Sequence, residues 1–142
     1  MVKILFVCHG NICRSPMAEF VLKDMAAKAG VSHLFQIDSC AASREEIGSG
    51  IDPPARRELN SHGIRCDGHR AQQITRKDLE TYDYIYYMDS RNRSYLRRMF
   101  PDFDGFTPFL DRDVADPWYS GDFTQTWFVI EERCKRLLEV LT

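Results

Sequence analysis

The pattern of apolar and polar positions predicts strands alternating with helices. Residues 2–7 are apolar apart from Lys3, which is typical of a strand buried on both faces of a parallel sheet. Three later runs rich in β-branched and aromatic residues have the composition of strands. These later strands are expected at 34–39, 84–88 and 106–110.

Helix-start and helix-stop signals delimit the segments between these runs. Ser15 suits an N-cap, Pro16 suits the first helical position, and Gly30 suits the stop of a helix over 16–29. Later helices are expected at 53–62, 76–81, 90–99 and 123–141, behind the capping residues Asp52, Thr75, Asp89 and Asp122.

This order of elements predicts the α/β class. We expect one domain over residues 1–142, with a four-stranded parallel sheet of order 2-1-3-4 and helices on both faces. Pro108 cannot donate to a ladder, so the fourth strand should be at an edge.

Composition limits the class of protein, its cellular compartment and its partners. The chain has 142 residues, 44% of them hydrophobic and 28% charged, which is ordinary for a globular domain. The net charge of −2 argues against nonspecific binding to nucleic acid, and no apolar run predicts a membrane span or a signal peptide. Five cysteines without a disulfide or zinc spacing favour a reducing cytoplasm. We therefore expect a cytoplasmic monomer without a membrane or nucleic-acid partner.

The loop after the first strand has the residues of an anion site. Gly10 and Asn11 let the chain curl tightly, so backbone N–H groups converge at a helix N-terminus. Arg14 adds a bidentate donor for phosphate oxygens. Cys8 lies at the floor of this cradle, where the N–H dipoles and the guanidinium favour the thiolate. The loop therefore predicts a nucleophile beneath an oxyanion binder, suited to attack on phosphorus.

The spacing Cys-x5-Arg is weak evidence when taken alone. A buried cysteine at a strand end and an arginine on a first helical turn would have the same spacing without any function. The functional interpretation is stronger here because Cys8 and Arg14 converge on one cradle of anion size.

Residues 7–16 resemble the phosphate-binding loop of the low-molecular-weight protein tyrosine phosphatases. The loop follows the first strand, whereas the larger tyrosine phosphatases and rhodanese-like phosphatases have theirs late in the domain. The resemblance extends over nearly the whole chain and implies no metal or organic cofactor. It implies that phosphate or another oxyanion binds at His9, Gly10, Asn11, Ile12, Cys13, Arg14 and Ser15.

The resemblance also implies supports for this loop. Ser39 and His69 match family residues that brace Asn11, and Ser15 is placed to hydrogen-bond the leaving thiolate. The alternatives are a serine that satisfies its own turn and a histidine on a surface loop. The segment after His69 departs from the family pattern because Gln72 stands where an arginine is usual.

A second chemical stretch, Asp116-Pro117-Trp118-Tyr119, follows the fourth strand. A bound phosphate dianion and a thiolate would keep part of the Asp116 carboxyl protonated, as a general acid needs. The family has Asp-Pro and an aromatic residue here, so the resemblance implies that Asp116 is the acid. Trp118 and Tyr119 would form a substrate wall with Ile12.

Glu45 stands where the family often has an aromatic wall residue. With Glu46 it would select against acidic sequence around the substrate phosphate by like-charge repulsion. A solvated loop without a role in specificity is an equally good interpretation.

The function implied is hydrolysis of phosphotyrosine in proteins or peptides through a cysteinyl-phosphate. Apolar Ile12 favours an aryl phosphate, although related bacterial enzymes with a polar residue there act on phosphoarginine. An arsenate reductase would need two further cysteines, but residues 67–133 contain none. A phosphate-binding module without turnover is a weaker alternative, because nucleophile, anion binder and acid are all present.

Cys13 adds a prediction of redox control. It lies five residues after Cys8 across the same tight loop, so a disulfide between the two is sterically conceivable. Peroxide would oxidise the Cys8 thiolate to a sulfenic acid that Cys13 captures. The family pattern includes this second cysteine. The alternative is a small buried residue that packs under the loop.

Overall fold

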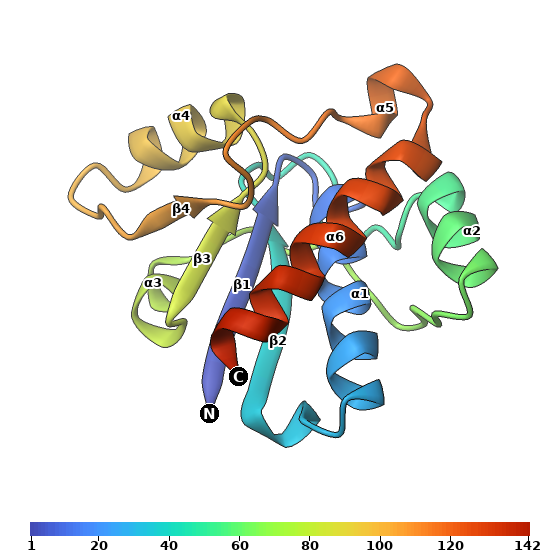
Figure 1. The fold of residues 1–142 in the computed structure, drawn as a ribbon. Helices are drawn as coiled ribbons and strands as arrows, with labels where there is room; N and C mark the ends of the chain where they lie inside the picture. The colour runs from blue at the N-terminus through green and yellow to red at the C-terminus, as the bar shows by residue number, and fades with distance from the viewer.

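The computed structural model describes residues 1–142 as a central sheet with helices around it (Figure 1). Its elements are β1 Val2–Cys8, α1 Arg14–Lys28, a 3-10 turn η1 Ser32–Leu34, β2 Phe35–Ala41, α2 Pro53–Ser61, α3 Arg76–Thr81, β3 Tyr84–Tyr87, α4 Ser90–Met99, β4 Phe106–Pro108, α5 Pro117–Ser120 and α6 Phe123–Leu141.

The sheet has four parallel strands in the order β2-β1-β3-β4. In the centre, Ile4 of β1 pairs with Ile37 of β2 on one side and with Tyr84 of β3 on the other. Pro108 lies in the edge strand β4. The predicted class, strand order and edge position are therefore confirmed.

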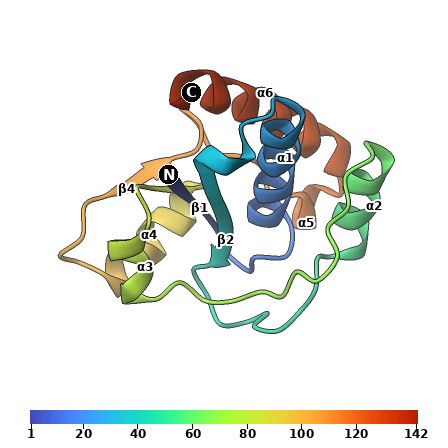
Figure 2. The same cartoon turned by 90° about the horizontal axis from the view of Figure 1, so that it is seen from below.

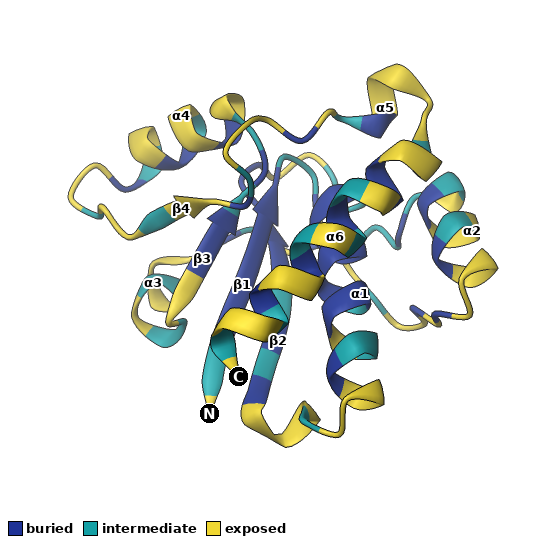
Figure 3. Ribbon diagram, viewed as in Figure 1, coloured by how far each residue is buried: buried dark blue, intermediate teal, exposed yellow.

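Helices cover both faces because β1 alternates its apolar side chains between them. Ile4, Phe6 and Cys8 join a core cluster with α1, α2 and α6, whereas Leu5 and Val7 join a second cluster with α4. Figure 2 shows α1 and α6 on one side of the sheet and α3 and α4 on the other, and Figure 3 shows the central strands buried between them. Since all strands are parallel, their carboxyl ends meet at one edge, where the functional loops lie.

Local capping signals predict most helix bounds correctly. Thr75 and Asp78 form the capping box of α3, and Asp89 and Asp122 accept from the first turns of α4 and α6. Asp52 precedes α2 without capping it through its side chain. The predicted strand ends are displaced by one or two residues, and the short helix α5 is not among the predicted elements.

The predicted start of the first helix is wrong. Helix α1 begins at Arg14, its N-cap is Cys13, and no side chain caps it. Ser15 lies inside the first turn, where its hydroxyl contacts Cys8 and Asn11 instead of a helix N–H group. The N–H groups that open α1 therefore remain free of a side-chain cap.

No helix in the described chain is both long enough and apolar enough to cross a membrane.

Candidate active site

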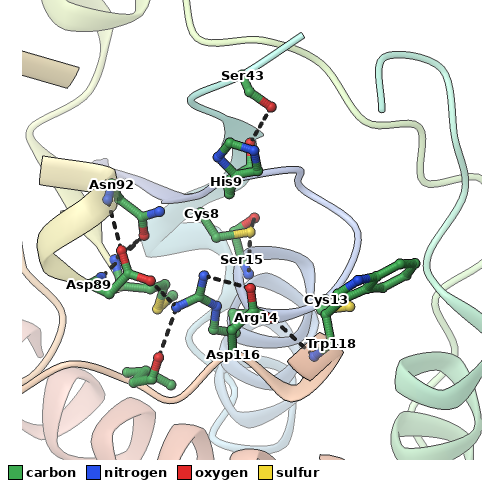
Figure 4. A network of polar contacts seen from close by, with 12 residues as sticks. Cys8, His9, Cys13, Arg14, Ser15, Ser43, Asp89, Asn92, Asp116 and Trp118 are labelled. Atoms are coloured by element: carbon green, nitrogen blue, oxygen red, sulfur yellow. Dashed lines mark hydrogen bonds and ion pairs between the residues drawn. The ribbon is translucent and has the colours of Figure 1, made fainter. Parts of the chain in front are cut away.

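The segment 8–15, called here the phosphate loop, joins the end of β1 to the start of α1. Cys8 is 3% exposed, and its Sγ lies 2.9 Å from the Ser15 hydroxyl. The backbone N–H of Ser15 also donates to this sulfur over 3.4 Å. Figure 4 shows the thiol of Cys8, the Ser15 hydroxyl and the Arg14 guanidinium close together. Two polar groups on the first turn of α1 thus face the sulfur and can donate hydrogen bonds to it.

Asn11 holds the loop in its curled form. Its φ of 60° makes it the one residue other than glycine with a positive φ in the described chain. Its buried Nδ2 donates to the hydroxyls of Ser15 and Ser39, over 2.8 and 2.9 Å. His69 Nε2 lies 2.8 Å from the Asn11 carbonyl oxygen. The contacts predicted for Ser39 and His69 are therefore present, and their supporting roles remain predictions.

Gln72 completes this arrangement through its backbone. Its N–H donates to Asn11 Oδ1 over 3.3 Å, and its carbonyl accepts from Ala41. A backbone contact does not depend on the side chain, so this contact is present with glutamine at position 72.

Arg14 is 2% exposed, and its guanidinium is held by residues at the start of α4 and on the segment 111–121. Its Nη1 donates to Asp89 Oδ2 over 2.7 Å and to the Val114 carbonyl over 2.8 Å, while Nη2 lies 3.4 Å from Asp116 Oδ2. Burial lowers the pKa of Arg14, but the charges on Cys8, Asp116 and Asp89 outweigh burial and raise it. The guanidinium is therefore a fixed, permanently charged group beside the thiol.

Asp116 lies on the segment 111–121, called here the acid loop. Its Oδ1 accepts from the Trp118 N–H over 3.0 Å, so it caps the short helix α5. Its other oxygen is the one that faces Arg14. The side chain is 25% exposed, which leaves the carboxyl open to the site from the solvent side.

These groups line one hollow of about 160 Å³. The full lining is Cys8, His9, Gly10, Ile12, Cys13, Arg14, Glu45, Glu46, Asp116, Trp118 and Tyr119. The structure thus brings every predicted loop and wall residue into one place, except the buried Asn11 and Ser15, which lie behind the lining.

Glu45 and His9 form part of the rim. Glu45 Oε2 lies 2.9 Å from His9 Nε2; the Glu45 side chain is largely exposed, and the His9 side chain is partly exposed. The Ser43 hydroxyl donates to the His9 carbonyl over 2.9 Å, which ties the rim to the loop after β2. A Cβ at Gly10 would lie 3.3 Å from Glu46 Cγ, so the loop and the rim approach closely there.

Cys13 faces Asp52 at the start of α2. Its Sγ lies 3.8 Å from Asp52 Oδ2 and is buried. Burial, then the charges of Cys8 and Asp52, raise the pKa of Cys13 well above its usual range. The raised pKa favours the protonated form of the Cys13 thiol.

Three contributors to the site do not appear among the predicted site residues. Asp89 was interpreted only as a helix cap, although it also anchors Arg14. Glu19 is 7% exposed and accepts from the Ser39 hydroxyl, and Lys23 pairs with it. Asp89 carries a signal that could have been used, because it follows β3 at the edge of the sheet where ligands bind. Glu19 carries none, since its partner in the site, Ser39, is distant in sequence.

Comparison with known proteins gives a family match over almost the whole chain. The model of the family described as low molecular weight phosphotyrosine protein phosphatase matches residues 3–142. The low molecular weight protein-tyrosine-phosphatase YfkJ of Bacillus subtilis is 38% identical over 97% of this chain and 94% of its own sequence.

Solved structures agree with this match. The crystal structure of YfkJ superposes with a TM-score of 0.94 at 37% identity, covering 99% of this chain and 94% of that one. The low molecular weight protein tyrosine phosphatase of Streptococcus pyogenes superposes with a TM-score of 0.93 at 39% identity, covering 100% of this chain and 94% of that one. A Drosophila arginine phosphatase superposes with a TM-score of 0.87 at 28% identity, covering 97% of this chain and 96% of that one.

Proposed function

Since the chain belongs to the low-molecular-weight phosphotyrosine protein phosphatase family, we propose roles for its own residues in that chemistry. The protein is a protein-tyrosine phosphatase that hydrolyses phosphotyrosine monoesters through a cysteinyl-phosphate. The substrates are phosphotyrosine-bearing proteins or peptides.

In the first step, the Cys8 thiolate attacks phosphorus in line with the phenolic leaving group. The S–P bond forms while the P–O bond to the tyrosine ring breaks, and Asp116 donates its proton to the departing oxygen. Arg14 and the free N–H groups at the start of α1 stabilise the equatorial phosphoryl oxygens. The anchoring of Arg14 by Asp89 supports this role, because a fixed guanidinium needs little reorganisation.

In the second step, a water molecule attacks the phosphoryl group and passes a proton to the Asp116 carboxylate. The S–P bond breaks, and the electron pair returns to Cys8 as a thiolate. The Ser15 hydroxyl, 2.9 Å from that sulfur, donates a hydrogen bond to the developing charge. Inorganic phosphate then leaves, and no metal or organic cofactor takes part in either step.

One observation carries these assignments: Cys8, Arg14 and Asp116 line the same small hollow, although Asp116 is more than a hundred residues from the other two in sequence. The exposed rings of Trp118 and Tyr119 form one side of it and fit an aryl group. We assign Ile12 to the opposite rim, where its apolar side chain favours a phenyl ring over a cation.

The test compares peptides that carry phosphotyrosine, phosphoserine or phosphoarginine in one sequence. We expect turnover of the phosphotyrosine peptide, competitive inhibition by orthovanadate and phosphate, and weak activity on the other two. Preferred hydrolysis of phosphoarginine would instead assign this chain the activity named for its Drosophila structural relative. Absence of any turnover would indicate a phosphate-binding module.

Cys13 is proposed as the thiol that protects Cys8 from over-oxidation. A sulfenic acid on Cys8 and the Cys13 thiol would condense to a disulfide with loss of water, and dithiothreitol would restore both thiols. Both residues line the same hollow. Peroxide-treated Cys13→Ser should recover a smaller fraction of its own starting activity than the wild type does. Equal recovery would leave Cys13 with a packing role.

The expected setting is the reducing cytoplasm, and the expected state is a monomer. All five cysteines are free thiols in the structure, which supports the first expectation. Light scattering coupled to size-exclusion chromatography would test the second.

A further inference from the structure

A second hollow adjoins the catalytic one, and His9 belongs to the walls of both. The second hollow has a volume of about 400 Å³ and lies mainly against the outer face of α4. Besides His9, its lining consists of Ser90, Arg91, Ser94, Tyr95 and Arg98. A group held there would therefore lie next to the phosphate site without entering it.

Two cationic side chains line this hollow, and neither forms an ion pair within the protein. Arg91 and Arg98 are seven residues apart, which places them two turns apart on one face of α4. Both are exposed, and neither guanidinium has a carboxylate within ion-pair distance. Arg98 stacks on the Tyr95 ring, with its Cζ 5.5 Å from the centroid, so at least one guanidinium has a defined position.

The opposite side of His9 is negative. Glu45 contacts His9, and Glu46 also lines the catalytic hollow. On the α4 side, the His9 ring meets the Tyr95 ring edge-to-face at 6.2 Å. A line of contacts from Glu45 through His9 and Tyr95 to Arg98 thus crosses the rim from negative to positive. A peptide crossing this rim would meet opposite charges on the two sides of its phosphotyrosine.

The N-terminus of α4 already has an anionic partner within the protein, so it is not available to bind a ligand in this hollow. The Asp113 carboxylate accepts from the Ser90 N–H and hydroxyl over 3.0 and 2.9 Å. Recognition in the hollow would therefore depend on Arg91 and Arg98, aided by the exposed Ser94 hydroxyl.

We propose that this hollow is a substrate subsite that binds an anionic side chain of the phosphopeptide near its phosphotyrosine. The ligand is an aspartate, a glutamate or a second phosphorylated residue, held by Arg91 and Arg98. The inference rests on the proposed hydrolysis of phosphotyrosine peptides. It predicts a preference for anionic side chains near the phosphotyrosine, in addition to recognition of the phosphoryl group by the phosphate loop.

The first measurement uses phosphotyrosine peptides that differ at one position, with aspartate, asparagine or lysine placed in turn at each site flanking the phosphotyrosine. An aryl phosphate without flanking residues serves as a reference. At the favoured position, kcat/KM for the aspartate peptide should exceed that of its asparagine partner by about fivefold, mainly through KM. The ratio should fall as salt is added, because both guanidiniums are exposed.

The second measurement uses matched variants of α4. Arg91→Gln/Arg98→Gln removes the two charges that line the hollow, and Arg93→Gln/Arg97→Gln removes two exposed charges that do not line it. The aspartate-to-asparagine ratio should fall to about one in the first variant and persist in the second. Arg91→Glu/Arg98→Glu should come to prefer the lysine peptide, a gain that misfolding cannot produce.

The possible results distinguish failure of the proposed subsite from failure of the proposed phosphatase activity. If the wild type hydrolyses the aryl phosphate and all peptides with equal kcat/KM, the subsite is refuted while the phosphatase assignment stands. An equal loss of preference in both glutamine variants would also refute it, because the general field of α4 would then be the cause. If the wild type hydrolyses none of these phosphates, both proposals fail.

Discussion

The residues that support the phosphate loop are buried, whereas the wall of the acid loop opposite is mostly exposed. In the phosphate loop, Asn11 and Ser15 are 0% exposed and Arg14 is 2% exposed. Across the hollow, Trp118 is 57% exposed and Tyr119 is 75% exposed. The two sides of one site therefore differ greatly in how many protein contacts fix each side chain.

The difference follows from how each side is supported. Every polar group of Asn11 that faces the protein finds a partner on β2, α1 or the segment 69–72, so the loop conformation is specified by several elements at once. The wall is carried by α5, which has only four residues. The proposed phosphate site is thus supported by buried residues, whereas the residues proposed to contact the leaving group and the aryl ring lie on the surface. Substitutions on the buried side should therefore lower activity more than substitutions on the exposed side.

The largest effect is expected at Cys8, on the buried side. Cys8→Ser should lower kcat on an aryl phosphate by about five orders of magnitude or more, because a hydroxyl is a poor nucleophile at neutral pH. Cys66→Ser is the matched control, since Cys66 is an equally buried thiol in the core cluster. Circular dichroism should show both variants folded. Appreciable turnover by Cys8→Ser would remove Cys8 from the mechanism.

A smaller and selective effect is expected at Asp116, on the exposed side. Asp116→Asn should slow hydrolysis of phosphotyrosine by roughly 10²–10⁴-fold, because its leaving group needs a proton. An activated nitrophenyl ester needs little protonation and should lose less.

The control is Asp111→Asn, which removes an exposed carboxylate from the same acid loop. Equal losses for good and poor leaving groups in Asp116→Asn would show that Asp116 is not the acid.

A substitution at Asp89 tests the contact that holds Arg14 in place. Asp89→Asn keeps an acceptor for the cap of α4 but removes the charge that pairs with the guanidinium at 2.7 Å. We expect kcat/KM to fall about 10- to 100-fold, as misplacement of a catalytic group can cause. Asp122→Asn at the cap of α6 is the control for capping alone. If both variants lose the same small amount, Asp89 acts only as a cap.

The smallest effect is expected at the wall. Trp118→Ala should raise KM for phosphotyrosine about two- to tenfold with little change in kcat, because one exposed ring contact is lost. Trp118→Phe should retain most of the affinity. An unchanged KM in Trp118→Ala would place the aryl ring of the substrate elsewhere.

The buried and exposed sides also differ in how far the sequence predicts them. The strand order, the edge position of Pro108 and the capping box at Thr75 follow from local patterns, and all are present. Cys8 and Arg14 could be placed in one cradle because only a short loop lies between them.

Partners that are distant in sequence could not be predicted in the same way. Ser15 was expected both to cap the first helix and to hydrogen-bond Cys8, and only the contact with Cys8 is present. The pairing of Asp89 with Arg14 spans 75 residues and exists only once the sheet has formed. Helix α5 was missed because four residues carry no periodicity.

The central claim is that the reaction passes through a phosphoryl group on Cys8, and direct trapping tests it best. Asp116→Asn should accumulate the intermediate with nitrophenyl phosphate, because the first step needs little acid whereas the second lacks its base. The reaction is quenched in denaturant within the first turnovers, and intact-mass and peptide mass spectrometry locate the added group. The account predicts one phosphoryl group on the Cys8 peptide and none in Cys8→Ser. A phosphoryl group on His9 or another residue, or hydrolysis without any covalent species, would contradict it.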